Sequence, residues 1–307
     1  MDGVIRTDLA MEARELHPEL EGVEEENSLF DGVQVSRIRI TTTAAAERLG
    51  KQMGRYITLD APDLTLKPAG LSEAVSRALA RELILLMEGV APEAPVLVAG
   101  LGNRAVTPDS LGPRVADGIY VTRHIKQYMA DAVPETVREV SALAPGVLGV
   151  TGVETREIIQ GVVEHTQPAL IIAVDSLASR RAARISTTIQ LTDTGISPGA
   201  GIGNNRSGLN AESLGAPVIA IGVPLVVYAG TIARDTISLI ADATGRHDEE
   251  ENLKDLADRV IHEHIGELIV TPKEIDALVA EMTRIVADGI NRALFGMDYV
   301  GVRTLIA

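Results

Sequence analysis

Two aspartates follow strongly apolar stretches of this chain. Asp109 comes after the apolar run 96–100 and a glycine turn, and Asp175 directly follows the apolar run 170–174. If both runs are strands of one parallel sheet, their C-terminal ends share the edge at which such sheets carry active sites. Two neighbouring carboxyls titrate separately, so one stays protonated while its partner activates water. The alternative, which the pattern alone favours, is that each aspartate caps the next helix or turn.

The turn at residues 100–105, GLGNRA, matches a dinucleotide-binding pattern. That pattern works where a helix begins inside the turn, so that its first N–H groups bind the pyrophosphate. Here Pro108 and a turn-like sequence follow instead, and no acidic residue closes an obvious second strand. An NAD-dependent oxidoreductase therefore remains only a minor alternative, because one such match is weak evidence.

Two further clusters have a less specific pattern. His262 and His264 are two residues apart, which places their imidazoles on different sides of a helix and disfavours a metal site. Glu154, Arg156 and Glu157 could line a cleft, but the start of a helix is the favoured interpretation. No residue has the context of a serine-hydrolase nucleophile.

Composition excludes several kinds of chemistry. The 307 residues contain no Cys and no Trp, with two Phe and five Tyr. Thiolate catalysis, disulfides and Cys-ligated metals are excluded, and aromatic platforms for bases are nearly so. A net charge of −15 opposes direct binding of nucleic acid. No leader-like segment and no apolar run of membrane-spanning length is present, so we expect a soluble cytoplasmic protein with no membrane association.

The elements that must position the aspartates alternate along the chain. This alternation predicts an α/β fold with a mainly parallel central sheet flanked by helices. Expected strands lie at 32–40, 55–62, 94–102, 136–147, 169–179 and 216–224, with a more exposed strand at 183–195. Expected helices lie at 41–54, 71–89, 152–168, 227–245 and 271–294, and residues 108–129 are expected to be a loop followed by a helix. The segment 195–215 is rich in Gly, Asn and Ser and long for a connection, which is typical of a functional loop.

Several irregular segments together resemble one family. They are IRTDLAMEARE, GLGNRAVTPDSLGP, GVETREIIQGV, IIAVDSLASR, ISPGAGIGNNRSGLNAESLGAPVIAIGVP and IVTPKEIDALV. In this order they resemble the germination protease of spore-forming bacteria, over nearly the whole chain. That family degrades small acid-soluble spore proteins, which protect spore DNA.

The resemblance implies a fold, a catalytic site, and the maturation, assembly and location of the protein. It implies an atypical aspartic endopeptidase, with a fold similar to the hydrogenase-maturation endopeptidases, and it matches the family's two essential aspartates to Asp109 and Asp175. It also implies a zymogen that removes its own propeptide, a homotetramer, location in the spore core, and no cofactor or metal. The implied substrate sequence is close to Thr-Glu-(Phe/Ile)-Ala-Ser-Glu, cut after the first Glu.

Residues 7–12, TDLAME, resemble that substrate sequence position by position. We therefore expect self-cleavage between Asp8 and Leu9, which makes 1–8 a propeptide and 9–307 a single peptidase domain. Asp8 is then a recognition residue and not a third catalytic aspartate.

The expected mechanism has one ionised aspartate deprotonating water and one protonated aspartate supplying the leaving group with a proton. Which aspartate takes which role stays open at this point. Backbone N–H groups of 195–215 are candidates for binding the oxyanion. Two alternatives remain: a carboxylate–metal peptidase of the same fold, and a non-catalytic binding protein for spore proteins.

Overall fold

The computed structural model describes residues 7–129, 131, 133–197, 208–264, 266 and 268–306. Its strands are β1 (Val23–Phe30), β2 (Val33–Ile40), β3 (Gly54–Asp60), β4 (Val96–Gly100), β5 (Val140–Leu143), β6 (Leu170–Ser179), β7 (Thr188–Thr192), β8 (Val218–Tyr228) and β9 (Ile269–Val270). Its helices are α1 (Ala10–Leu16), α2 (Thr43–Leu49), α3 (Leu71–Leu86), α4 (Leu111–Asp117), α5 (Arg123–Tyr128), α6 (Leu148–Thr151), α7 (Thr155–Thr166), α8 (Ala211–Leu214), α9 (Ala229–Thr244), α10 (Glu250–His264), α11 (Ile275–Phe295) and α12 (Tyr299–Ile306).

The strands of the described residues form one mixed sheet. Their order is β1-β2-β3-β7-β8-β6-β4-β5, and β9 pairs with β8. The pairs β5–β4, β4–β6 and β6–β8 are parallel, whereas the remaining pairs are antiparallel. The expected α/β class is confirmed, and its parallel part is the half of the sheet that contains the two most apolar strands. The sheet as a whole is mixed rather than mainly parallel. The two-residue turn between β1 and β2 permits only antiparallel pairing, and β3, β7 and β9 also pair antiparallel with their neighbours.

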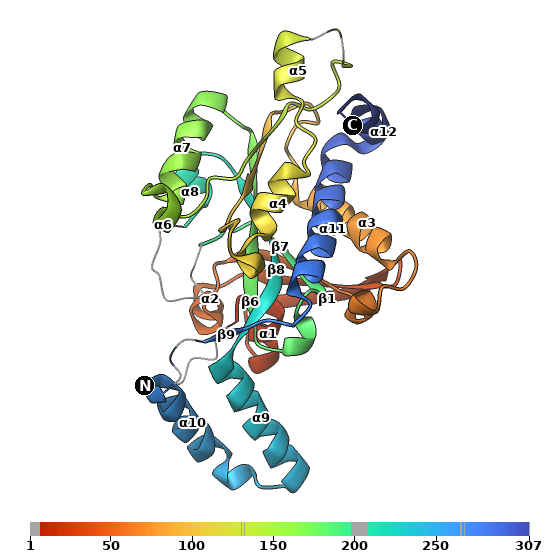
Figure 1. Ribbon diagram of the computed structural model, residues 1–307. Helices are drawn as coiled ribbons and strands as arrows, with labels where there is room; N and C mark the ends of the chain where they lie inside the picture. The colour runs from red at the N-terminus through yellow and green to blue at the C-terminus, as the bar shows by residue number, and fades with distance from the viewer. Residues whose placement is uncertain are drawn as a thin grey trace.

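Helices cover both faces of the sheet (Figure 1). One face carries α3, α4 and α11, and their apolar side chains join those of the sheet in the largest buried cluster. The other face carries α7 and α8, which bury Ile159 and Leu214 in a second cluster. The layers that the alternating sequence predicts are therefore present, with the parallel strands at their centre.

The strands β1 and β7 differ from the sequence-based expectation. β1 was not expected, because its acidic sequence VEEENSLF has no apolar alternation; it is an edge strand whose residues are mostly exposed. The strand at 183–195 was expected to be more exposed, yet all five residues of β7 are buried. The reason is its place between β3 and β8, where the polar side chains of β7 face protein instead of solvent.

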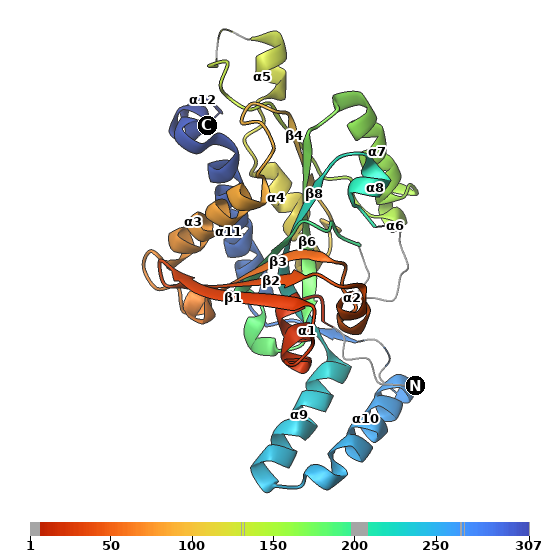
Figure 2. The same ribbon diagram turned by 180° about the vertical axis from the view of Figure 1, so that it is seen from behind.

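Helices α9 and α10 pack against each other and project from the body of the molecule (Figure 2). The charged sequence 246–260 is helical over most of its length, because α10 begins at Glu250. Among the helices that the structure describes, none is long and apolar enough to cross a membrane.

Candidate active site

A cavity of about 440 Å³ brings the predicted site residues together. Asp109 and Asp175 both line it, as the shared edge of a parallel sheet requires. Asp8 lines the same cavity, so the expected cleavage position lies beside the expected catalytic pair.

Asp175 lies inside β6 rather than after it, because this strand continues to Ser179. It stands opposite Gly222 of β8 in the parallel register and is 8% exposed. Its Oδ1 accepts a hydrogen bond of 2.8 Å from the backbone N–H of Ser176. Burial, followed by the negative charge of Asp109, raises the pKa of Asp175 to about 8. Asp175 is therefore mainly protonated at neutral pH.

Asp109 ends the 3₁₀ turn η2 (Thr107–Asp109) and is held by the glycine turn after β4. The backbone N–H of Asn103 donates to its Oδ2 at 2.7 Å. Gly102 has φ +113°, and a Cβ there would lie 2.1 Å from the carbonyl oxygen of Asp109. The dinucleotide-like turn therefore positions Asp109 instead of a pyrophosphate, because Gly102 lets the backbone of the turn approach the carbonyl group of Asp109. No helix begins in this turn, since α4 starts only at Leu111.

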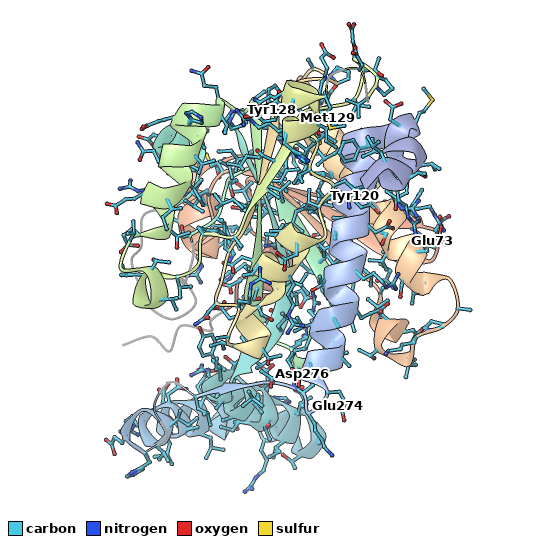
Figure 3. The ribbon with its side chains drawn as sticks, turned by 45° about the horizontal axis from the view of Figure 1, so that its top comes forward. Glu73, Tyr120, Tyr128, Met129, Glu274 and Asp276 are labelled. Carbon is cyan, nitrogen blue, oxygen red and sulfur yellow. The ribbon has the colours of Figure 1, made fainter. Side chains whose placement is uncertain are left out.

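Helix α4 fixes the position of the Asp109 loop against the sheet. A Cβ at Gly112 would lie 2.2 Å from the carbonyl oxygen of Leu101 and 2.4 Å from that of Val174. The helix therefore contacts the end of β4 and the middle of β6 directly, next to Asp175. The start of α11 supports the same loop, because Asp276 (Figure 3) accepts a 3.1 Å hydrogen bond from Thr107 Oγ1.

The chain around Asp8 is bound in the cavity in an extended form. Its N–H donates to the carbonyl oxygen of Ala178 at 3.0 Å, and the N–H of Ala178 donates to Asp8 Oδ2 at 2.7 Å. The carbonyl oxygen of Asp8 accepts hydrogen bonds from Lys51 Nζ at 3.0 Å and from Gln190 Nε2 at 3.1 Å. Both the acidic side chain and the peptide group that follows it are therefore held.

The residues after Asp8 fill enclosed sites. Leu9, Ala10 and Glu12 are each 0% exposed. The carboxylate of Glu12 accepts hydrogen bonds from the backbone N–H of Arg180 at 2.6 Å and of Arg181 at 3.0 Å. The guanidinium of Arg184 lies 3.4 Å from the same carboxylate. Glu12 is thus a buried charge with paired donors, the condition under which burial of a carboxylate is tolerated.

Lys51 and Gln190 are the site residues that sequence reasoning missed. Gln190 lies on β7, whose alternating Thr188, Gln190 and Thr192 resembled a solvent-facing strand. This row of alternating polar residues was the sequence signal for Gln190, because it indicated a strand face that binds a peptide. Lys51 follows the glycine that ends α2, and its place in the cavity depends on contacts that local sequence does not encode.

The remaining sequence candidates lie elsewhere or only partly within the described residues. Glu154 is the residue before α7, so the helix-start interpretation is confirmed, although its side chain makes no cap hydrogen bond. His264 ends α10 with its side chain exposed, and the side chain of His262 is outside the described part. Within the described residues, no group of three or more His, Cys, Asp or Glu side chains is placed to hold a metal ion.

The loop at 195–215 is described at its two ends. Gly195, Ile196, Ser197, Gly208 and Asn210 line the cavity. Residues 198–207 lie outside the described residues, as do 1–6 of the expected propeptide.

The fold and the cavity define an α/β protein with a paired-carboxyl site of the kind that can activate water. A family model described as germination protease (Peptidase_A25) matches residues 4–261. Proteins named germination protease are 45% identical in Caldanaerobacter subterraneus subsp. tengcongensis (94% of both chains) and 44% identical in Clostridium perfringens (94% of this chain, 95% of that one). The chain belongs to the germination protease family, and it is an endopeptidase of spore germination.

More distant proteins match as well. The germination protease of Bacillus cereus is 38% identical, over 94% of this chain and 93% of its own. Among solved structures, the [NiFe] hydrogenase maturation protease HycI of Thermococcus kodakarensis matches 58% of this chain and 96% of its own, with 17% identity and a TM-score of 0.31.

Proposed function

We propose that this endopeptidase is a zymogen that cleaves itself between Asp8 and Leu9, with Asp109 and Asp175 as its catalytic pair. The observation that carries the proposal is the position of that peptide bond. Asp8 lines the cavity that both aspartates line, and its carbonyl oxygen is bound by two donors. Substrate and catalytic groups are thus held together in one chain, as catalysis by proximity requires.

The two aspartates take different roles in this proposal. Asp175, whose pKa is raised to about 8, keeps its proton at neutral pH and donates it to the leaving nitrogen of Leu9. Asp109 is the ionised partner and takes a proton from the attacking water. Its hydrogen bond from the N–H of Asn103 supports this role, because such a donor stabilises a carboxylate.

The bound N-terminal segment supports the zymogen proposal. Residues 1–8 are the propeptide in this scheme, and 9–307 form the peptidase domain. While Asp8 lies in the wall of the cavity and Lys51 and Gln190 bind its carbonyl oxygen, a second polypeptide cannot make the same contacts. Cleavage after Asp8 creates two new chain ends, which frees the segment to leave.

The expected substrates are small acid-soluble spore proteins, and the expected location is the spore core. The bound segment supports this substrate class, because an acid at residue 8, an apolar residue at 9, Ala at 10 and Glu at 12 reproduce the sequence pattern implied by the resemblance. The enclosed positions of Leu9, Ala10 and Glu12 would select the same pattern in a second chain.

The expected homotetramer is supported by apolar side chains on the projecting helices. On α9 and α10 the exposed apolar residues are Ile232, Leu239, Ile240, Leu253, Leu256 and Val260. A helix pair with this many exposed apolar residues is typical of an association surface. We place subunit contacts on this pair.

Terminal sequencing and intact mass test the proposed function. The wild-type chain is expected to yield a new N-terminus at Leu9, whereas Asp109→Asn and Asp175→Asn yield none. An Asp175→Asn variant that still produces the Leu9 terminus would refute the assignment of Asp109 and Asp175 as the catalytic pair. Loss of cleavage after exhaustive chelation, restored by a divalent metal, would support the metal-dependent alternative. Absence of cleavage in the wild-type chain under every condition would overturn the proposed self-cleavage.

A further inference from the structure

We propose that Lys51 and Gln190 bind the carbonyl oxygen of the cleaved peptide bond and stabilise the negative charge that forms on it. This inference rests on the proposed function and assigns the groups that activate its substrate carbonyl. Lys51 Nζ lies 3.0 Å and Gln190 Nε2 lies 3.1 Å from the carbonyl oxygen of Asp8. Two donors on one carbonyl oxygen beside a catalytic pair are the arrangement of an oxyanion-binding site.

Gln190 contacts the chain both before and after the bond between Asp8 and Leu9. Its Nε2 donates to the carbonyl oxygen of Asp8, while its Oε1 accepts a 2.6 Å hydrogen bond from the N–H of Ala10. These two partners fix the orientation of the amide, because a donor and an acceptor must face opposite kinds of group. The bond between Asp8 and Leu9 lies between the two contacts, so Gln190 aligns the reacting carbonyl as well as polarising it.

The sheet fixes the backbone position of Gln190. It lies in the middle of β7, opposite Thr58 of β3 and Gly222 of β8, and is 7% exposed. Gly222 is also the partner of Asp175 across the β6–β8 pair. The proposed acid and the proposed carbonyl donor therefore stand on strands that flank the same residue of β8, and their relative placement is set by the sheet.

Lys51 supplies a positive charge from a different element. Gly50 ends α2 in the left-handed region, with φ +62°, and the N–H of Lys51 donates to the carbonyl oxygen of Ala46 at 3.0 Å. Helix α2, which this turn follows, lies beside α1 (Figure 2). Lys51 Nζ also donates to the carbonyl oxygen of Thr7 at 3.1 Å. Burial lowers the pKa of Lys51, while the carboxyls of Asp8 and Glu12 act in the opposite direction.

Hydrolysis begins when water attacks the carbonyl carbon of Asp8. One water proton passes to Asp109, and the electron pair of the carbonyl π bond moves to the oxygen. Lys51 and Gln190 bind this oxyanion more strongly than the neutral carbonyl, because a full charge gains more from a charged donor and a fixed dipole. The carbon–nitrogen bond then breaks as the nitrogen of Leu9 takes the proton of Asp175. A carboxyl group on Asp8 and an amine on Leu9 result.

These donors differ from the backbone candidates that the sequence suggested. The sequence hypothesis assigned oxyanion binding to backbone N–H groups of 195–215. In the part of the chain that the structure describes, the side chains of Lys51 and Gln190 donate to the carbonyl oxygen of Asp8. The described ends of that loop line the same cavity.

The test compares self-cleavage rates of full-length variants by intact mass. Lys51→Met keeps the aliphatic chain and removes the charge, and Gln190→Glu keeps the shape and removes the N–H donor. Each is expected to slow formation of the Leu9 terminus by about 100- to 1,000-fold, the usual loss for one oxyanion donor. Lys51→Arg is expected to recover part of the rate, because it restores a cation. Exposed Lys67→Met is the matched control and should cleave like wild type.

Three outcomes decide the proposal. Slow cleavage by both variants with wild-type thermal unfolding, together with partial recovery in Lys51→Arg, supports it. Cleavage by Lys51→Met and Gln190→Glu within threefold of the wild-type rate overturns it while leaving the catalytic pair intact. Failure of the wild-type chain to form the Leu9 terminus overturns the proposed function itself, and this inference with it.

Discussion

Asp175 differs from an ordinary surface aspartate in two ways. It is buried within a central strand, and Asp109 adds a negative charge nearby, so its pKa rises to about 8. The backbone N–H of Ser176 opposes this shift only in part. A carboxyl group that keeps its proton at neutral pH is what a general acid needs.

We predict that self-cleavage slows as the pH rises through about 8. The acid form of Asp175 is required in our proposal, and above its pKa that form decreases about tenfold per pH unit. The measurement is the rate of appearance of the Leu9 terminus between pH 6 and 10. Far-ultraviolet circular dichroism at each pH controls for unfolding. A rate that increases steadily across this range would contradict the assignment of Asp175 as the acid.

At the scale of elements, the site depends on the close contact of α4 with the sheet. Gly112 packs against backbone atoms of Leu101 and Val174, and Gly100 lies against the carbonyl of Gly112 in return. Backbone atoms cannot be displaced as a flexible side chain can. The position of the Asp109 loop relative to Asp175 is therefore set by two glycines that allow helix and strands to touch.

We predict that Gly112→Ala abolishes self-cleavage and destabilises the fold. Its Cβ would lie 2.2 Å from the carbonyl oxygen of Leu101, so α4 must move away and take Asp109 with it. We expect a loss of unfolding free energy of about 1–3 kcal/mol, as for other overpacked sites. Gly161→Ala in α7 is the matched control, because no atom lies within 4 Å of its Cβ.

The control variant should gain stability rather than lose it. Alanine in place of glycine inside a helix stabilises by about 0.5–1 kcal/mol. Chemical denaturation and the cleavage assay are applied to both variants. Cleavage by Gly112→Ala at the wild-type rate would mean that the α4 contact does not control the site.

A second prediction concerns Glu12, whose contacts hold α1 beside the cavity. Glu12→Gln is expected to slow self-cleavage by about 10- to 100-fold, since charge-assisted hydrogen bonds contribute about 1.5–3 kcal/mol each. The charge of Glu12 is matched by the N–H groups of Arg180 and Arg181 and by the Arg184 side chain. Glu19→Gln, at an exposed position, serves as the control. Equal cleavage rates in the two variants would remove Glu12 from substrate recognition.

For the whole molecule, the cavity is built from segments far apart in the sequence. The bound N-terminal segment, the turn after α2, η2, β6 and β7 all contribute to it. The projecting α9–α10 pair lies outside this assembly (Figure 1) and carries exposed apolar side chains. Our proposals therefore place catalysis and subunit association in separate parts of the molecule.

We predict a native mass of four chains of 32.5 kDa each. The combined change Leu239→Glu and Leu256→Glu is expected to reduce it to that of a dimer or monomer, because two charges cannot be buried without partners. Light scattering after size-exclusion chromatography measures the mass. Leu66→Glu is the control, because Leu66 is apolar, is even more exposed (77%, against 68% for Leu239 and 49% for Leu256) and lies on another element. A wild-type chain that migrates as a monomer at micromolar concentration would refute the tetramer.

The sequence by itself determined the α/β class, most of the strands and helices, and the family. Apolar runs such as 170–174 have few ways to be buried other than in the centre of a sheet, and irregular segments such as the one around Asp109 are specific enough to identify relatives. It also placed Asp8, Asp109 and Asp175 as candidates, and the structure brings all three to one cavity.

Only the tertiary structure showed what surrounds those residues. The role proposed for Asp175 follows from burial and from the charge of Asp109, which are properties of the folded environment. The contacts of Lys51 and Gln190 with the carbonyl of Asp8 join residues separated by long stretches of chain. Local propensity describes neighbours in sequence, whereas a site is made by neighbours in space, so the carbonyl-binding pair became visible only after folding.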